Sequence, residues 1–438
     1  MKRNLLSIIF LALATALSAQ NIRVDSVSMG SGNPSYPYDV FYNLATGDKD
    51  TVVNTNWHLA FAMRPALPPA NVMRSTTVRI NASRNVTLYK SNFTSNQWSS
   101  FDTTGFTAWP IMANGDSSWD VAAFNADYNA SNPFDYGWGQ YNMNSHNVEG
   151  TKMFLLAIGS GATKKYKKIT IEKLAYDTLW FFTFSNLDGT DSTTQTISKP
   201  SYKGKLFAYY NVLTKTVIDR EPNRPWDLVF THYRTNATFP GFPTSAFNFA
   251  GVLQAPQLNV ARVANLAKPL SDTSDATSYS KRMGTIGWDW KVTPLGPPPS
   301  GPWNLTDSLT YFIKRDKDSL TYKLTFDKFS NVPSQIIVFN IKTYLPKMNT
   351  GVSNIADLNR EVSLFPNPAK QMVNVSIPSI SGKEQVAVSI IDMTGKVVSS
   401  TSIIGNNTQI DLSGFNKGLF FINLSIDGVS STKKLIIE

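Results

Sequence analysis

The sequence predicts an all-β protein: two tandem, mostly antiparallel β domains followed by a small β-sandwich. Three observations lead to this fold class. Short runs of β-branched and aromatic residues alternate with polar residues, as in strands with one face in water. Gly, Pro, Asn and Asp separate these runs, as turns do. No long stretch places its apolar residues with the 3.6-residue period of a helix.

The first 19 residues are predicted to be a secretory signal peptide. Lys2 and Arg3 precede an apolar run from Leu5 to Leu17, and Ala19 is the small residue expected before the cut. A signal anchor is the alternative, but the run is too short to span a bilayer comfortably. We therefore expect no transmembrane segment after cleavage.

Composition narrows the classes of partner and chemistry. The chain has no cysteine, so neither disulfides nor thiol chemistry are expected. Its net charge of +10 would favour an anionic surface such as lipopolysaccharide, and no nucleic-acid partner is expected. The one lysine cluster, Lys164 to Lys168, opens an alternating segment. We interpret it as edge-strand lysines that prevent aggregation.

The body of the chain contains an internal repeat. Residues 40–44 lead to residues 56–61 much as residues 208–212 lead to residues 225–230, each time with a Trp near the start of the second segment. Further matched segments follow in the same order, which indicates a duplication. The repeat predicts the following division: signal peptide 1–19, β domain 20–200, β domain 201–344, linker 345–360 and C-terminal domain 361–438.

The C-terminal domain shows the clearest strand pattern. Val373, Val375 and Ile377 alternate with polar residues, and residues 386–390 repeat the alternation. A turn is expected at residues 392–396, before the next strand. Short strands at such even spacing are typical of an Ig-like β-sandwich.

This domain resembles the type A sorting domain of the type IX secretion system. Four motifs occur in the family's order: Phe-Pro-Asn-Pro-Ala, Asp-Met-Thr-Gly-Lys, Asp-Leu-Ser-Gly-Phe with Lys-Gly-Leu-Phe, and a final Lys-Lys-Leu-Ile. The alternative is an ordinary Ig-like accessory domain. The resemblance implies export through the periplasm to the outer surface or the medium, with the type IX machinery as partner. The sorting-motif residues that it marks are Phe365, Pro366, Asn367, Pro368, Asp392, Gly395, Gly418, Lys433 and Lys434.

The body resembles tandem HmuY-like domains, whose founding members are secreted all-β haem-binding proteins. In the second unit the resemblance rests on residues 209–211, 226–230, 251–253, 285–290 and 309–313, and the first unit is a diverged copy. It implies haem as a possible cofactor. Haem needs His or Met axial ligands, and the candidates are His232, Met63, Met143, His146 and Met283.

Each of these residues could instead have a purely structural role, as a His at the end of a strand or a Met in a loop.

The tryptophans also fall into two groups, one expected in the core and one expected at the surface. Trp57 and Trp226 stand at matched places and are expected to pack in the core. The loop aromatics are candidates for an exposed platform for a sugar or a tetrapyrrole: Trp109, Trp119, Trp138 and Tyr141.

Signatures of catalysis are absent from the sequence. It has no Gly-x-Ser-x-Gly, no His-Glu-x-x-His and no phosphate-binding Gly-Lys-Ser/Thr loop. Residues 186–191 suggest a hairpin turn rather than a calcium loop, so no metal site is predicted.

Asp followed by Ser or Thr and then an apolar residue or Thr recurs seven times in the body. This pattern resembles the O-glycosylation acceptor of bacteria with type IX secretion, although Asp and Ser/Thr also open strands after turns. The implied acceptors are Ser26, Thr51, Thr103, Thr178, Ser192, Ser308 and Ser319.

Together these patterns predict a non-enzymatic, secreted or surface-anchored binding protein. Haem or another tetrapyrrole is its candidate ligand, and a lineage that has lost haem binding stays open. The alternative is a structural or adhesive surface protein that meets polysaccharide or protein partners through aromatic loops. The sequence leaves open the ligand, the oligomeric state and whether the sorting domain is removed.

Overall fold

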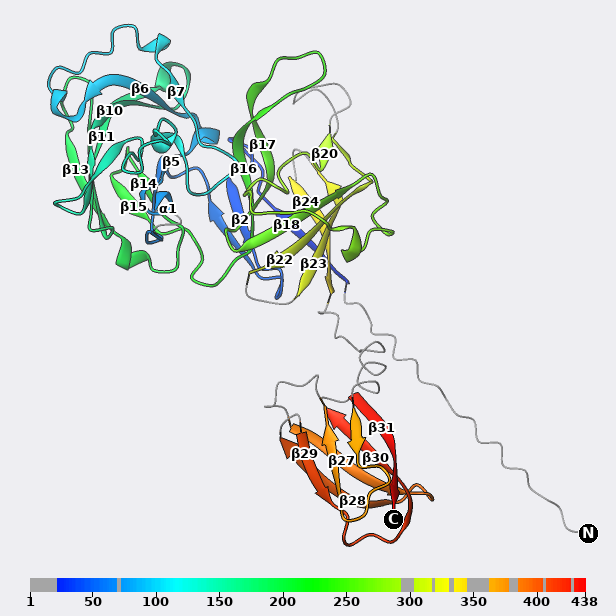
Figure 1. Cartoon of the computed structure of the whole chain (residues 1–438). Coiled ribbons are helices and arrows are strands. Elements are labelled where there is room, and N and C mark those ends of the chain that lie inside the picture. Colours follow the sequence, from blue (N-terminus) through cyan, green and yellow to red (C-terminus); the bar gives the residue numbers. More distant parts are fainter. Residues whose placement is uncertain are drawn as a thin grey trace, which may run out of the picture. The chain divides into compact units, whose positions relative to one another are not determined.

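The computed structural model describes residues 22–68, 72–292, 303–316, 320–330, 335–344, 362–377, 385–404, 407–426 and 429–438. It contains two compact units, Met1–Pro346 and Lys347–Glu438, which are described separately (Figure 1). The predicted signal peptide and the linker 345–360 lie outside the described residues. No helix in the described ranges is long and apolar enough to cross a membrane.

The described residues confirm the all-β prediction. Strands pair antiparallel in every sheet, and helices are single turns. The helical turns are α1 (Met73–Thr76), η1 (Ala82–Arg84), η2 (Ser95–Gln97), η3 (Phe106–Ala108), η4 (Ala123–Asn125), η5 (Gly161–Thr163), η6 (Lys199–Tyr202) and η7 (Thr273–Asp275).

The body, the larger unit, consists of two lobes, each with two sheets around an apolar core. In the first lobe an eight-stranded sheet (order β13-β12-β11-β10-β6-β7, with β8 and β9 beside β11) faces a four-stranded sheet (β15-β14-β4-β5). Its strands are β4 (Leu59–Ala62), β5 (Val78–Ile80), β6 (Val86–Thr94), β7 (Ile111–Met112), β8 (Gly139–Asn142), β9 (Asn147–Gly150), β10 (Lys152–Ile158), β11 (Lys165–Ala175), β12 (Leu179–Ser185), β13 (Thr193–Ser198), β14 (Phe207–Asn211) and β15 (Thr216–Ile218).

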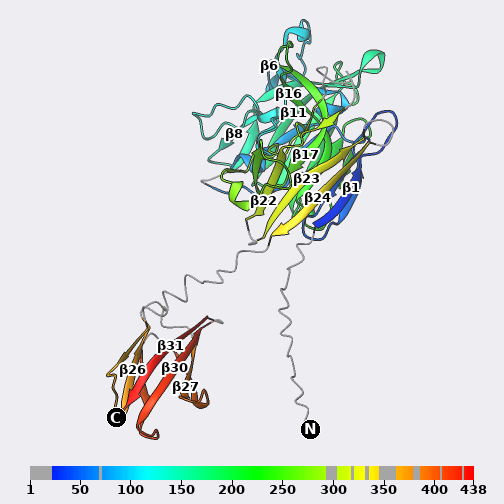
Figure 2. The ribbon, with the colours of Figure 1, turned by 90° about the vertical axis from the view of Figure 1, so that its right-hand side faces the viewer.

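The second lobe repeats this plan. A six-stranded sheet (β1-β24-β23-β22-β18-β19) packs against a four-stranded sheet (β17-β16-β2-β3), and β1 lies at the edge beside β24 (Figure 2). Its strands are β1 (Ile22–Ser28), β2 (Tyr38–Tyr42), β3 (Lys49–Val53), β16 (Leu228–Ala237), β17 (Ser245–Gln254), β18 (Leu258–Ala264), β19 (Tyr279–Ser280), β20 (Lys291–Val292), β21 (Asn304–Leu305), β22 (Leu309–Arg315), β23 (Thr321–Phe329) and β24 (Ile336–Tyr344).

The predicted boundary at residues 200 and 201 does not separate the sheets. The first three strands belong to the second lobe, because β1 pairs with β24 and β2 pairs with β16 (Figure 1). Conversely, β14 follows the predicted boundary yet pairs with β4 of the first lobe. The first lobe is therefore inserted into the second, and consecutive domains 20–200 and 201–344 are the wrong division of these strands.

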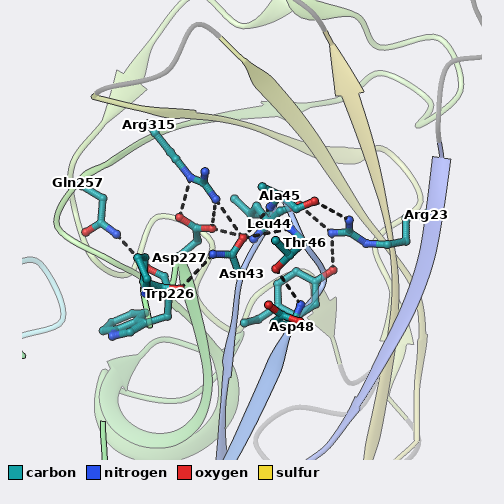
Figure 3. A network of polar contacts seen from close by, with 12 residues as sticks. Arg23, Asn43, Leu44, Ala45, Thr46, Asp48, Trp226, Asp227, Gln257 and Arg315 are labelled. Atoms are coloured by element: carbon teal, nitrogen blue, oxygen red, sulfur yellow. Dashed lines mark hydrogen bonds and ion pairs between the residues drawn. The ribbon is translucent and has the colours of Figure 1, made fainter. Parts of the chain in front are cut away.

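The repeated segments nevertheless occupy equivalent places in the two lobes. His58 Nδ1 accepts the amide N–H of Val212 (3.0 Å), just as Asp227 Oδ2 accepts that of Leu44 (2.7 Å; Figure 3). Burial lowers the pKa of His58 to about 4, so its imidazole is neutral and can act as an acceptor. Each repeated aromatic strand thus pairs with the Trp-containing segment of the other repeat.

The lysine cluster does not protect a sheet edge, so this interpretation was wrong. Its strand, β11, is internal, with β10 on one side and β12 on the other. Lys167 Nζ instead donates to Asn186 and Asp191 (2.7 Å each), and Lys168 Nζ donates to the carbonyl of Trp98 (2.9 Å). These lysines anchor loops that cover the sheet.

The C-terminal unit is a small two-sheet sandwich. The predicted inward residues Val373, Val375 and Ile377 are fully buried, and so is Val386 on the facing sheet. Its two sheets have the orders β25-β26-β29 and β28-β27-β30-β31. Their strands are β25 (Ser363–Phe365), β26 (Met372–Ser376), β27 (Gln385–Asp392), β28 (Val397–Ile404), β29 (Asn407–Asp411), β30 (Gly418–Ile426) and β31 (Val429–Ile437).

Candidate functional site

The structure places the five predicted haem-ligand candidates in three separate places. Met63 lines an open cleft of the first lobe, which we call the basic cleft. His232 and Met283 line a small cavity where the two lobes meet, the inter-lobe cavity. Met143 and His146 lie in the β8–β9 hairpin. Among the described residues, no three His, Cys, Asp or Glu side chains cluster as metal ligands would.

The basic cleft has a volume of about 590 Å³, within the range of about 300–1,000 Å³ typical of small-molecule sites. Four segments form it: the end of β4, α1, the β11–β12 turn and the segment between β13 and β14. Its lining is Met63, Arg64, Pro65, Arg74, Asp177, Thr178, Lys199, Pro200, Lys203, Gly204, Lys205 and Leu206. The lining therefore combines five cations and one carboxylate with the apolar side chains of Met63, Pro65, Pro200 and Leu206.

Lys199 is buried in the wall of the cleft and connects two of the segments that form it. Its Nζ donates to the carbonyl of Ser75 (2.7 Å) and to Asp177 Oδ1 (2.5 Å), and the side chain is only 5% exposed. Burial lowers its pKa to about 8, although the neighbouring Asp177 favours the charged form. Asp177 also accepts the amide N–H of Ala66 (2.6 Å), so this carboxylate ties three segments together.

The other cations differ in how far a ligand could reach them. Lys205 is also buried and pairs with Asp219, while Arg64 is half-buried and pairs with Asp120. Lys203 is exposed at the rim, and Arg74 is partly exposed. Sequence reasoning missed these residues. The signal available was the spacing of three lysines between positions 199 and 205.

The inter-lobe cavity is much smaller, at about 90 Å³. His232 stacks on Tyr36 with ring centroids 5.1 Å apart, and its Nδ1 has no hydrogen-bond partner among the described residues. Burial, with a smaller effect from Arg84, lowers the pKa of His232 to about 3. This histidine is neutral and packed. Its cavity falls well below the size of a typical small-molecule site.

The β8–β9 hairpin is a surface element. Met143 is 66% exposed, and the Tyr141 hydroxyl lies 2.9 Å from Nδ1 of the exposed His146. The ring of Tyr141 also stacks with that of Phe134 at an interplanar angle of 15°. The two predicted ligands here face solvent.

The predicted aromatic platform is not assembled. Trp138 is fully buried, Trp119 donates its indole N–H to the carbonyl of Gln254 (2.8 Å), and Trp109 packs on Phe101. Trp138, Trp119 and Tyr141 all pack on the core of the first lobe, whereas Trp109 packs in a different cluster, so the four rings form no common exposed surface. Core packing was the correct expectation for Trp57, which is 9% exposed.

The predicted glycosylation acceptors lie at the surface wherever they are described. Ser26, Thr51, Thr178 and Ser192 are exposed, and Thr103 and Ser308 are partly exposed. Ser319 lies outside the described residues.

In the C-terminal unit, the sorting-motif residues hold the last strand and its turns. Asn367 donates from Nδ2 to the carbonyl of Lys434 (2.7 Å) and accepts the amide N–H of Ile436 (2.9 Å). Asp392 Oδ1 accepts the amide N–H groups of Thr394 and Lys396 (2.8 and 3.1 Å). Gly395 lies in the same turn with a φ of 85°, and Gly418, the first residue of β30, has a φ of 155°. Glycine adopts such positive φ values without strain. Phe365 is 52% exposed, and the remaining motif residues are Pro366, Pro368 and Lys433.

Comparison with known proteins finds one family match, while no curated protein matches the chain. Three solved structures align at very low similarity. The first is PorZ, a surface component of the type-IX secretion system of Porphyromonas gingivalis (10% identity, TM-score 0.17, 77% of this chain and 41% of that chain). The second is dimeric latent PorU of the same organism (10%, 0.16, 82% and 31%). The third is a polysaccharide lyase (9%, 0.14, 88% and 40%). The chain spans less than half the length of each, and TM-scores this low carry no argument about function.

The family match concerns the C-terminal unit. Residues 363–438 match the model of the secretion system C-terminal sorting domain, the range over which the four motifs and the two-sheet sandwich occur. The chain therefore carries a C-terminal sorting domain of the type IX secretion system and is a cargo exported to the cell surface or the medium.

Proposed function

We propose that the body, residues 22–344, is a non-enzymatic binding module that takes an amphipathic anion in the basic cleft. The observation that carries the proposal is a ligand-sized cleft lined by five cations together with apolar side chains. Three of these cations, Lys199, Lys205 and Arg64, already pair with aspartates, so a ligand would depend mainly on the other two. Met63 and Leu206 supply apolar surface. Lys203 and Arg74, the more accessible cations, would meet acidic groups at the rim.

Two ligands share this chemistry. A tetrapyrrole such as haem has an apolar ring with carboxylates, and a lipopolysaccharide has acyl chains with phosphates. The cations of the cleft suit the acidic groups of either ligand, and a volume of about 590 Å³ would take a tetrapyrrole or one part of a lipopolysaccharide. For haem, the lining offers one thioether, Met63, and no imidazole. If haem binds in this cleft, its axial ligand from the protein would therefore be Met63, because His232 lies in the other cavity.

The first experiment titrates the full chain with haemin and, separately, with lipopolysaccharide. Saturable binding of either ligand is expected, and Lys203→Glu should weaken it about tenfold or more. Lys164→Glu is the matched control, because Lys164 is an exposed lysine of the same lobe outside the cleft. A Soret change that Met63→Ala weakens and His232→Ala spares would identify haem in this cleft.

Three outcomes would contradict the proposal. Binding of neither ligand would remove the amphipathic-anion class. Equal losses in Lys203→Glu and Lys164→Glu would show a diffuse effect of net charge instead of a site. Hydrolysis of a bound glycan would overturn the non-enzymatic assignment.

The adhesive alternative retains one specific observation, the nearly parallel Phe134–Tyr141 pair, in which Phe134 is 40% exposed and Tyr141 is partly exposed. Such rings can stack on neutral sugars, which the basic cleft would not favour. Binding of a neutral polysaccharide that Tyr141→Ala abolishes and Lys203→Glu spares would support this alternative over the cleft.

We also propose O-glycans on the Asp-Ser/Thr sites. The surface position of all six described acceptors supports the proposal. Mass spectrometry of the native secreted protein should find glycan masses on peptides carrying Thr51 and Ser192. Unmodified peptides at all seven sites would refute it.

A further inference from the structure

The inter-lobe cavity contains a buried guanidinium that lacks a counter-ion. Arg79 projects from β5, and the residue is only 9% exposed. Its Nη1 and Nη2 reach only the carbonyl oxygens of Ser118 and Gly115, both at 3.4 Å, which is long for N–H···O hydrogen bonds. The ring of Trp119 lies 5.2 Å from the guanidinium carbon.

Among the described residues, no carboxylate lies within ion-pair distance of Arg79. Burial accordingly lowers its pKa to about 10. A buried charge is costly unless it is paired, and two long hydrogen bonds with a ring contact use little of the five-donor capacity of a guanidinium. Arg79 therefore retains donors that could serve an anion.

The carboxylates around the cavity are committed to other partners. Asp39 pairs with Arg220 at 2.6 Å, and both side chains are nearly inaccessible. Glu221 accepts the amide N–H of Leu206 (2.7 Å) and the hydroxyl of Tyr209 (3.0 Å). Burial raises the pKa of Glu221 to about 7, so it carries only part of a negative charge near neutral pH. Asp120 also favours the charged form of Arg79, but its carboxylate forms an ion pair with Arg64, so none of these three acids pairs with Arg79.

From this geometry we infer that the inter-lobe cavity binds a small carboxylate against the guanidinium of Arg79. The volume of about 90 Å³ admits a few waters or a group of the size of acetate. A planar guanidinium matches a carboxylate in two parallel hydrogen bonds. Tyr233 also lines the cavity, from the second lobe.

The ligand would bridge the two lobes, since Arg79 belongs to the first and Tyr233 to the second. Binding to the folded state alone must then raise the stability of the body. Leu206 lines both this cavity and the basic cleft, but Arg79 and Tyr233 line only the cavity, so the inference can be tested independently of the proposed function.

The test titrates the full chain with sodium acetate against sodium chloride at equal ionic strength. We expect a saturable rise in Tm and a change in tryptophan fluorescence, because Trp57 and Trp119 line the cavity. Arg79→Met should weaken acetate binding at least about tenfold. Arg224→Met is the control, since Arg224 forms only exposed ion pairs.

A size series on the unaltered chain keeps the inference testable if Arg79→Met does not fold. Acetate and formate should bind, whereas benzoate should not, because its ring exceeds the space available. A response to acetate no greater than to chloride would overturn the inference. So would equal responses to acetate and benzoate, or an unchanged response in a folded Arg79→Met chain.

Discussion

Asp227 is the residue at which one change should most weaken the joint between the N-terminal strands and the second lobe. Its carboxylate accepts the amide N–H of Leu44 (2.7 Å) and two hydrogen bonds from Arg315, from Nε at 2.9 Å and from Nη2 at 2.5 Å (Figure 3). The side chain of Asp227 is 4% exposed and that of Arg315 is 22% exposed. Asp227→Ala would leave a buried N–H without its acceptor and would take the carboxylate away from Arg315, a mostly buried cation that keeps its hydrogen bond to Asn43 Oδ1 (3.3 Å).

The expected loss follows from these two effects. Breaking a buried ion pair by removing one partner costs about 3–5 kcal/mol, and an orphaned buried N–H costs about 1–3 kcal/mol. The two costs overlap, and Arg315 retains some contact with solvent. We therefore expect Asp227→Ala to lower the free energy of unfolding by about 3 kcal/mol. Asp227→Asn keeps an acceptor for Leu44 and should cost less.

Denaturant unfolding at pH 7, followed by tryptophan fluorescence, measures this loss. All ten tryptophans precede residue 304, so the signal reports the body and excludes the sorting domain. Asp48→Ala is the matched control, because its carboxylate is 47% exposed and exposed ion pairs contribute little. An Asp227→Ala chain no less stable than Asp48→Ala would refute the reasoning.

Three further predictions concern other parts of the chain. Residues 201–344 alone should fail to fold, since β24 and β16 would lose their partners β1 and β2; a cooperative unfolding transition of this fragment would contradict the strand exchange. Lys291 is fully buried and burial lowers its pKa to about 7. The unfolded state therefore binds more protons between about pH 7 and 10.5, and stability should rise over this window. Lys291→Met should remove that rise in pH-dependent denaturation, and an equal rise in the Lys291→Met chain would contradict this assignment. Asn367→Ala should loosen β31, because it removes two hydrogen bonds to that strand, and proteases should then trim the C-terminus faster. An unchanged rate of trimming would show that these two hydrogen bonds do not hold β31 in place.

The duplication could be predicted from the sequence, but the pairing of the repeated strands could not. Matched Trp-containing segments indicated a duplication, and His58 and Asp227 do occupy equivalent places. The sequence could not say which copy each repeated strand joins, because both copies offer nearly the same edge. That choice depends on how the connecting loops close over long separations in the chain.

The candidate site was less predictable than the fold. The cleft collects side chains from four segments between positions 63 and 206, and no local spacing reports such a convergence. Met63 was named for its sequence position and does lie in the cleft, while His232 lies packed beside Tyr36. The lysine cluster misled because local composition cannot distinguish an edge strand from an internal one.

By itself, the sequence determined the all-β class and the C-terminal sorting domain. Strand periodicity and turn residues act over a few positions, and the sorting motifs hold neighbouring turns and one terminal strand. Only the tertiary structure decided that the two repeats exchange strands, that cations line the basic cleft and that Arg79 is buried with no ion pair among the described residues. These features depend on contacts between distant residues, whose energies are set by burial and by the neighbours that the fold supplies.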